Sequence, residues 1–428
     1  MKKSLATILI AVCSAAFSFS QDPLTFMHYN LLNYGNFTSY CTASNNNINS
    51  KTEHLKTIVA YANPDVFTVN ELFCNSNLAD KIMDEALNVE TDKYKRAEIT
   101  CVSFAASLTN MLFYNSDKLG LASQSHVETA VRDINIYKLY SKTELGYDPD
   151  TVFFHCIVAH LKAGSDWDDA QEREAEVELL LAALSEDYQP GNFFFLGDFN
   201  IYRSSEGAFQ KLVDNPNADF RFHDPINRIG QWHNDYEYRD VHTQSTHTSS
   251  NGCASTGGMD DRFDFILING NVKYGNRKVA ALPSTYKAIG QDGQHFNSSI
   301  ISSPTNTSVP AHVLSALYYM SDHLPVSMKA LAGGNVGIEE LPGNLSHLRI
   351  INPVEDKLEI LLESNIAGNI VLMIYDYTGR LVVSESFVIS MGENYLSLPL
   401  SNLEKGLYVV KLKTANNRAV AEKVVIGG

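Results

Sequence analysis

Polar side chains stand at the ends of the most apolar segments of this chain. A rigid scaffold presents catalytic groups to solvent where its strands end, so residues at these points are the first candidates for chemistry. They are Asn30 after residues 26–29, Glu71 after 66–69, His160 after 152–159, Asp198 and Asn200 after 193–196, and Asp322-His323 before 324–326. Asp264 lies inside the apolar run 263–268. The spacing predicts that distant segments deliver one polar site.

These residue types suit metal-assisted hydrolysis of a phosphoester. A hard divalent cation such as Mg²⁺ prefers carboxylate oxygens and keeps several waters. Glu71, together with Asp198 or Asp322, can supply such oxygens. Two histidines, His160 and His323, can act near neutral pH on the attacking water and on the phosphoryl oxygens. A histidine in such a role needs an acceptor for its second nitrogen, and we expect Asp264 to serve His323.

The sequence resembles the endonuclease/exonuclease/phosphatase superfamily, which includes pancreatic-type deoxyribonuclease, abasic-site endonucleases, bacterial sphingomyelinases and inositol-polyphosphate phosphatases. Six short motifs appear in the family order: HYNLLNY, VNEL, AHLKAG, LGDFN, DRFDFIL and SDHLPV. Each string is short enough to occur by chance, but their order over residues 26–328 is specific. The resemblance implies a two-sheet α/β sandwich of the deoxyribonuclease type.

The resemblance also implies roles for the candidate residues. Glu71 would bind the metal with help from Asn30 and Asp322, and Mg²⁺ is the first expectation, with Mn²⁺ or Ca²⁺ as alternatives. Asp198 would handle the nucleophilic water or a second metal, and Asn200 would orient the phosphate. His160 would donate to the phosphoryl oxygens or to the leaving group, and His323, oriented by Asp264, would contact the scissile phosphate. Which histidine acts as the acid is left open, because family members differ on this point.

The four residues before the predicted strand 111–114 depart from the family pattern. Some members orient the first histidine with a glutamate before the strand that corresponds to residues 111–114, whereas this chain has Ser107-Leu108-Thr109-Asn110 there. We therefore expect His160 to be held by Asn110 or by a backbone carbonyl. Outside the motifs, we predict that Arg173, His242 and His247 are solvent-exposed.

The pattern of apolar residues agrees with a sandwich of sheets and helices. Apolar residues recur at helical spacing in 53–62, 78–86 and 177–184, and short aromatic or β-branched runs predict strands at 111–114, 152–159, 193–196 and 263–268. The polar stretches 245–258 and 286–310 are predicted to be loops.

The first twenty residues have the features of a secretory signal peptide, with Lys2-Lys3 before an apolar stretch too short to span a membrane. Removing it leaves five cysteines. Cys156 lies in an apolar run and is expected to be a buried free thiol. The other four can form disulfides in the exported protein, with the connectivity left open.

The residue composition of the chain changes after residue 330. A Gly-containing segment, 331–344, is predicted to be a linker, and the runs 358–362, 370–375, 381–389 and 407–412 predict a small all-β sandwich. Residues 345–428 resemble the type A C-terminal sorting domain of the type IX secretion system, through Asn352-Pro353, IYDYTGRLV, LEKGLYVVKL and Lys423. This resemblance implies export by that machinery, to the medium or the cell surface, of a catalytic domain spanning 21–330.

The net charge of the chain bears on the class of substrate that it can bind. A formal net charge of −16 argues against a broad cationic surface for polyanions. We still expect a monomeric nuclease or phosphodiesterase acting on DNA or RNA. The alternatives are a lipid phosphodiesterase of the sphingomyelinase type, a phosphatase of small phosphoesters, and a non-catalytic surface binding protein.

Overall fold

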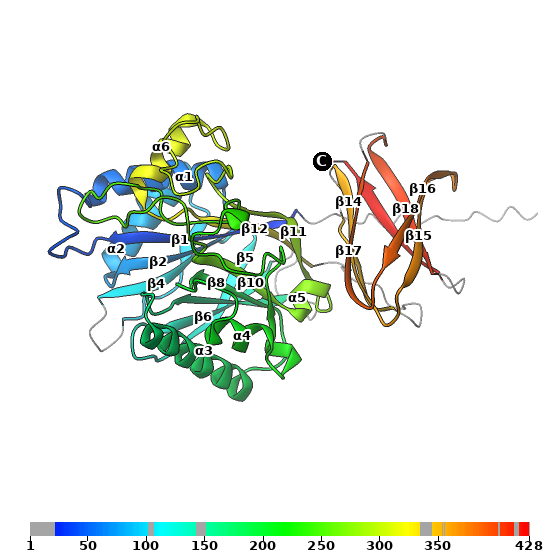
Figure 1. The fold of residues 1–428 in the computed structure, drawn as a ribbon, viewed down its shortest axis with the longest axis horizontal. Coiled ribbons are helices and arrows are strands. Elements are labelled where there is room, and N and C mark those ends of the chain that lie inside the picture. The colour runs from blue at the N-terminus through cyan, green and yellow to red at the C-terminus, as the bar shows by residue number, and fades with distance from the viewer. Residues whose placement is uncertain are drawn as a thin grey trace, which may run out of the picture.

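The computed structural model describes residues 22–101, 107–142, 151–333, 345–352, 354, 356–400, 403–414 and 419–427. The predicted signal peptide and most of the predicted linker lie outside these residues. Figure 1 shows a large α/β unit beside a smaller all-β unit, the arrangement that the sequence predicts.

The first sheet of the large unit has the strand order β11-β12-β1-β2-β4-β3. Its two central strands, β1 and β2, run parallel, so their carboxyl ends meet at one edge, with Asn30 beside Asn70. The strands are β1 Leu24–Tyr34, β2 Val66–Phe73, β3 Tyr94–Arg96, β4 Leu108–Asn115, β11 Val279–Ala288 and β12 Val326–Ala332.

The second sheet has the order β5-β6-β7-β8-β10-β9. Here β7 and β8 run parallel, which places His160 beside Asp198, and the antiparallel β10 places Asp264 on the other side of Asp198. The strands are β5 Leu119–Val127, β6 Ile134–Ser141, β7 Phe153–His160, β8 Phe193–Asp198, β9 Phe222–His223 and β10 Asp264–Asn269.

The two sheets pack face to face, and the helices cover their outer faces. Because side chains alternate along a strand, Phe194 and Leu196 of β8 join the core between the sheets, while Phe193 and Phe195 pack into a second core with helix α3. Figure 1 shows α1 and α6 on one side of the sandwich and α3 and α4 on the other. The helices are α1 Ile48–Ala62, α2 Ser76–Ile82, α3 Trp167–Asp187, α4 Gly207–Val213, α5 Gly270–Tyr274 and α6 Ala311–Met320, with short helical turns at Met83–Leu87, Ala218–Phe220 and Tyr236–Tyr238.

Arg173 corrects one sequence prediction, because it is buried rather than exposed. Only 1% of the residue is accessible, and its guanidinium donates to Glu206 at 2.7 and 3.1 Å. It also donates to the carbonyls of Lys162 and Gly164, so it joins α3 to the loop that follows β7. The four bonds satisfy a charge that burial would otherwise penalise.

The prediction for His242 and His247 is also wrong, since both side chains are buried. The imidazole of His242 lies between the carbonyls of Met259 and Trp232, at 3.2 and 2.7 Å. His247 stacks on the ring of Tyr318 at 4.1 Å between centroids. Both residues therefore support the long loops rather than face solvent.

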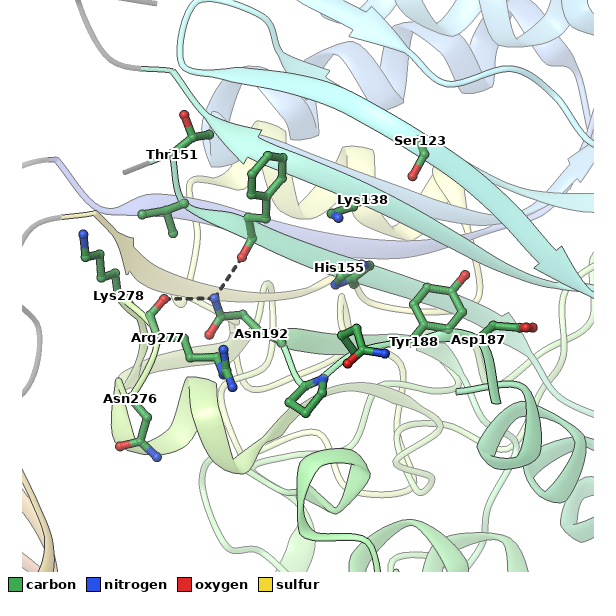
Figure 2. A pocket seen from close by; sticks show the side chains of 15 residues that line it. Ser123, Lys138, Thr151, His155, Asp187, Tyr188, Asn192, Asn276, Arg277 and Lys278 are labelled. Carbon is green, nitrogen blue, oxygen red and sulfur yellow. Dashed lines mark hydrogen bonds between the residues drawn. The ribbon is translucent and has the colours of Figure 1, made fainter. Parts of the chain in front are cut away.

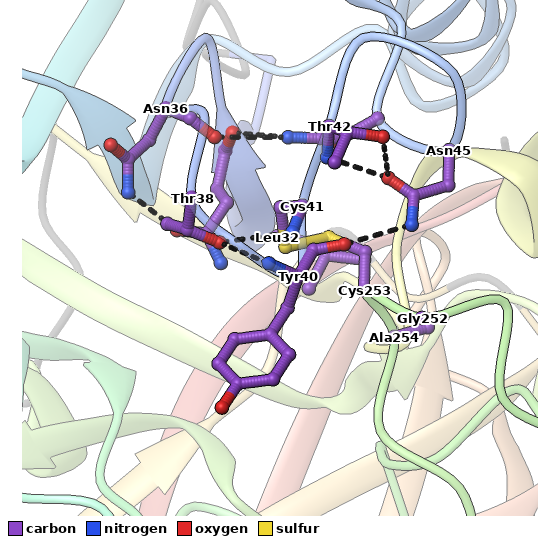
Figure 3. The surroundings of a disulfide bond; sticks show 12 residues. Leu32, Asn36, Thr38, Tyr40, Cys41, Thr42, Asn45, Gly252, Cys253 and Ala254 are labelled. Carbon is purple, nitrogen blue, oxygen red and sulfur yellow. Dashed lines mark hydrogen bonds between the residues drawn. A yellow bond between two sulfur atoms is a disulfide. The ribbon is translucent and has the colours of Figure 1, made fainter.

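The structure resolves the cysteine connectivity that the sequence left open. Cys41 pairs with Cys253, Cys74 pairs with Cys101, and Cys156 is a buried free thiol as predicted. Figure 3 shows that the Cys41–Cys253 bond joins the loop after β1 to the polar loop 245–258.

The small unit consists of two antiparallel sheets around one apolar core, which agrees with the predicted all-β sandwich. The sheet orders are β13-β14-β17 and β16-β15-β18-β19. The strands are β13 Leu345–Ile350, β14 Lys357–Ser364, β15 Gly368–Asp376, β16 Leu381–Ile389, β17 Gly392–Pro399, β18 Gly406–Thr414 and β19 Ala419–Ile426.

The two units are in contact at α5. The ammonium of Lys273 lies 2.5 and 2.6 Å from the two carboxylate oxygens of Glu393, and the hydroxyl of Tyr274 donates to the same carboxylate. The buried Arg349 donates to the carbonyl of Lys273 at 2.8 Å. Among the described residues, no helix is long and apolar enough to cross a membrane.

Candidate active site

The carboxyl edges of β1, β2, β7 and β8 bring several of the predicted residues together. Strand pairing explains this, because the register sets His160 beside Asp198 and Asp198 beside Asp264. Irregular pairing of β2 with β4 between Val69 and Leu72 marks a bulge that contains Glu71. Glu71 has φ 60° there, in the left-handed region that is unusual for such a residue, and bulges of this kind re-aim side chains beside active sites.

Asn30 joins two carboxylates at the centre of the site. Its amide donates to Glu71 Oε1 at 3.0 Å and to Asp198 Oδ2 at 2.9 Å, while its own oxygen accepts from the Leu32 amide. The second oxygen of Glu71 accepts from the backbone amide of Asn33 at 2.7 Å. The carboxyl end of β1 therefore fixes the position of the Glu71 carboxylate.

Glu71, His160 and Asp198 form a group whose candidate ligand atoms all lie within 4.8 Å of one another. His160 Nε2 is 3.5 Å from Asp198 Oδ2 and 4.0 Å from Glu71 Oε1. Burial raises the pKa of Asp198 to about 7, against the opposing effect of His323, because a charged carboxylate is disfavoured so deep in the protein. A divalent cation fits this donor set, since its positive charge would stabilise the carboxylates of Glu71 and Asp198.

His323 lies on the other side of Asp198. Its Nδ1 is 2.7 Å from Asp264 Oδ2, and its Nε2 is 3.7 Å from Asp198 Oδ2 and 2.6 Å from the side-chain amide of Gln244. Burial alone would lower the pKa of His323, but the carboxylates of Asp264 and Asp198 raise it well above its usual value. A protonated imidazole donates from both nitrogens, so in that state the Gln244 oxygen is the atom that fits opposite Nε2.

His160 has the opposite electrostatic environment. Burial lowers its pKa well below the usual value, and the nearby charges of Arg132 and His323 add to the effect. Its Nδ1 has no hydrogen-bond partner among the described residues, so the predicted support from Asn110 or a backbone carbonyl is not found. The Asn110 amide donates instead to Asn135 Oδ1 and to the carbonyls of Asp133 and Val158.

Asn200 and Asp322 lie at the same edge with different contacts. The Asn200 amide donates to the carbonyl of Leu161 at 3.2 Å, and its backbone amide donates to Asp198 Oδ1 at 3.1 Å. Asp322 is buried and accepts from the Ser255 amide at 2.8 Å, while its other oxygen has no partner in the described part of the chain. Asp322 is not in the group of Glu71, His160 and Asp198.

Sequence reasoning missed three residues that hold the site together. Asn70 accepts from the Asp198 amide at 2.9 Å, and Gln244 contacts His323. Arg132 donates to the carbonyls of His160 and Leu161 at 2.8 and 2.9 Å, which fixes the chain just after β7. The only sequence signal was the place of Asn70 next to Glu71, because Arg132 and Gln244 lie outside every motif.

A family model matches most of the small all-β unit. The model of the secretion system C-terminal sorting domain matches residues 352–427, which supports a secreted or cell-surface location. No curated protein matches the chain.

Similar solved structures include a humanised Danio rerio TDP2 at 16% identity and TM-score 0.45, covering 72% of this chain and 98% of that one. An endonuclease/exonuclease/phosphatase from Bacteroides vulgatus has 13% identity and TM-score 0.45, covering 73% and 100%. The human Nocturnin catalytic domain with bound sulfate has 12% identity and TM-score 0.41, covering 72% and 94%.

The Endonuclease/Exonuclease/phosphatase family model matches residues 27–323, a range that contains Asn30, Glu71, His160, Asp198, Asn200, Asp264, Asp322 and His323. Members of this family hydrolyse phosphoesters and generally depend on a divalent metal. Since the match spans well over half of the chain, this protein belongs to the endonuclease/exonuclease/phosphatase family.

Proposed function

We propose that this protein is a secreted, divalent-metal-dependent phosphodiesterase whose most favoured substrate is DNA or RNA. The observation that carries the proposal is the placement of two carboxylates and two oppositely tuned imidazoles around one point at the sheet edges. The proposed catalytic residues are His160, Asp198, Asn200, Asp264 and His323.

The proposed metal ligands are Glu71, Asn30 and Asp322, with Mg²⁺ as the first candidate and Mn²⁺ or Ca²⁺ as alternatives. Glu71 offers hard oxygens held by the Asn30 amide, and Asp198, which accepts from the same amide, can orient the attacking water or hold a second cation. When bound, such a cation offsets the negative charge that develops on the phosphoryl group.

The protein's own groups divide the remaining work. Asp198 lies between the two imidazoles, where its carboxylate can accept a hydrogen bond from the attacking water and orient it. His323, held through Nδ1 by Asp264 and through Nε2 by Gln244, adds a positive charge beside the phosphoryl oxygens. His160, whose pKa is depressed, offers a neutral ring on the side of Glu71.

Exposed aromatic rings support a nucleic-acid substrate for an acidic protein. Tyr40 is 73% exposed on the loop that follows β1, the strand whose Asn33 anchors Glu71. Trp167 is 74% exposed just after the loop that follows His160. Figure 3 shows the Tyr40 ring extending away from the Cys41–Cys253 bond. Bases stack on such rings without sequence preference, which supplies affinity that a net charge of −16 does not.

The same rings favour one alternative, a lipid phosphodiesterase of the sphingomyelinase type. Phe37, on the same loop as Tyr40, is 55% exposed, and exposed aromatic side chains also insert at the surface of a membrane. Phosphatase activity on a small phosphoester has no comparable structural support.

The test compares turnover of plasmid DNA, RNA, sphingomyelin vesicles and a chromogenic phosphodiester, each with Mg²⁺ and with a chelator. We expect metal-dependent cleavage of DNA or RNA, weakened by Tyr40→Ala. Cleavage of sphingomyelin alone would select the lipid alternative, and no turnover of any substrate would support a non-catalytic binding protein.

We also propose the predicted organisation for the whole chain: a signal peptide at 1–20, a catalytic domain at 21–330, a linker at 331–344 and a sorting domain at 345–428. The proposed partner of the sorting domain is the type IX secretion machinery. The match of residues 352–427 supports this part of the proposal.

A further inference from the structure

A cavity of about 640 Å³ lies at the opposite end of the second sheet from the candidate active site. It is lined by residues at the start of β7 and β8, such as Phe153 and Asn192, whereas His160 and Asp198 stand at the other ends of these strands. Strands of this length separate their two ends by roughly 20 Å. Figure 2 shows the cavity and the side chains that line it.

The lining is basic, although the chain as a whole is acidic. Lys138, Arg277 and Lys278 contribute positive charge, and Asp187 is the only carboxylate in the lining. The Lys138 ammonium lies over the Phe153 ring, 4.8 Å from its centroid. Within the ranges that the structure describes, neither Lys138 nor Arg277 is paired with a carboxylate. In a protein with a net charge of −16, a cavity lined by three basic side chains and one carboxylate is a specific local feature.

Two buried polar atoms in the same wall have no partner. His155 is 8% exposed and Asn192 is 3% exposed, yet His155 Nδ1 and Asn192 Oδ1 make no hydrogen bond in the described part of the chain. The Asn192 amide nitrogen is already used, because it donates to the carbonyls of Phe153 and Arg277 at 2.8 and 3.1 Å. These buried atoms make the wall polar, which suits a charged ligand better than an apolar one.

The wall is also held in place before any ligand arrives. The His155 ring stacks on Phe193 with centroids 4.5 Å apart, and Tyr188 packs edge-on against it at 5.5 Å. The imidazole therefore has little freedom to turn away from the cavity.

We propose that this cavity is a binding site for a small organic anion that carries a phosphate or carboxylate group. Lys138 and Arg277 hold the anionic group, and His155 and Asn192 line the wall beside it. The volume is in the range of small-molecule sites. Burial and the neighbouring Lys138 charge lower the pKa of His155 to about 4, and a bound anion would raise it.

Calorimetric titration tests the proposal, with inorganic phosphate, adenosine monophosphate and citrate as separate probes. A chelator is present throughout, to suppress metal-dependent binding and hydrolysis at the candidate active site. We expect at least one probe to bind with a Kd below about 10 mM, and the Lys138→Gln/Arg277→Gln variant to bind it at least about tenfold more weakly. His155→Phe, which keeps a ring on Phe193, should also weaken binding.

Glu71→Gln is the matched control, because it changes the distant site and should leave this affinity unchanged. Imidazole NMR gives a second readout, since the probe that binds should shift the His155 resonances. The proposal is overturned if none of the probes binds the wild-type chain. It is equally overturned if the double variant, with an unchanged thermal melt, binds as tightly as wild type or if Glu71→Gln abolishes binding.

Discussion

Two imidazoles stand on either side of the Asp198 carboxylate, and their surroundings move their pKa values in opposite directions. Carboxylates at Asp264 and Asp198 outweigh burial at His323 and raise its pKa, whereas burial and nearby cations lower the pKa of His160. The site thus holds one charged and one neutral ring at the same pH. This separation is the usual basis for assigning different roles to paired titratable groups.

The His323–Asp264 contact should behave as one functional unit. Asp264→Asn removes the charge that holds and stabilises the imidazole, and His323→Ala removes the imidazole itself, so each should lower turnover by about 10²- to 10⁴-fold. The double variant should be little worse than His323→Ala, because groups that act through one step are non-additive. Steady-state kinetics on the three proteins measures this. Losses that multiply in the double variant would show independent roles.

Glu176 gives a prediction for stability against pH. This carboxyl is buried on α3 and accepts from the Lys162 amide at 2.8 Å, and burial raises its pKa from the usual 4.5 to about 7. The folded state therefore binds this proton more tightly than the unfolded state, so stability is lost as pH rises from about 4.5 through 7. Glu176→Gln should gain up to about 3 kcal/mol over wild type at pH 8 and little at pH 4.

Thermal melts between pH 4 and pH 8 test this prediction, with Glu178→Gln on the exposed face of the same helix as the control. Parallel pH profiles for wild type and Glu176→Gln would mean that the buried carboxyl does not titrate as described.

At the scale of elements, the sequence predicted most of the sandwich correctly. The apolar runs that end in Glu71, His160 and Asp198 are buried strands of two sheets, and the three predicted helical segments lie within α1, the α2 region and α3. Local periodicity was sufficient because these elements bury one or both faces in a continuous core. The order of the motifs then identified the family.

Contacts between distant segments could not be predicted in the same way. Arg173 was expected on a solvated face because its helical neighbours are acidic, but its partner Glu206 lies 33 positions later, at the N-cap of the next helix, α4. His242 lies next to polar loops in sequence, yet the fold closes over it. Arg132 and Gln244 reach the site only through tertiary packing, so no local pattern marks them.

The Cys41–Cys253 bond should support the loops around the candidate site. It joins segments 212 residues apart, and these segments also carry Asn33, which holds Glu71, and Ser255, which holds Asp322. Replacing both cysteines by serine should cost about 2–4 kcal/mol of unfolding free energy, measured by chemical denaturation. Turnover should fall as well. Unchanged stability and turnover in the double variant would contradict this account.

At the scale of the whole molecule, the C-terminal unit, residues 345–428, has an apolar core of its own and contacts the large unit at a limited interface. Deleting residues 345–428 removes the contacts of Glu393 with Lys273 and Tyr274 and uncovers apolar surface at Leu282 and Leu331, which pack with Ile351. The truncated enzyme should keep its turnover in vitro, melt a few degrees lower and fail to be exported.

Assays of the purified truncated protein and of culture fractions measure these three effects. Glu393→Gln in the full chain is the matched variant, and it should lower the melting temperature without blocking export. A truncated protein that is folded but inactive would make the tail part of the catalytic unit.

The central claim is that Glu71 and its neighbours form a metal-dependent hydrolytic site, and one comparison tests it most directly. Hydrolysis of a chromogenic phosphodiester is measured for wild type, Glu71→Gln and the exposed-helix control Glu53→Gln, in Mg²⁺ and in chelator. The account predicts full activity for wild type and Glu53→Gln in Mg²⁺, a loss of about 10²-fold or more for folded Glu71→Gln with partial recovery at high Mg²⁺, and no activity for any protein in chelator. Wild-type activity that persists unchanged in chelator would contradict it.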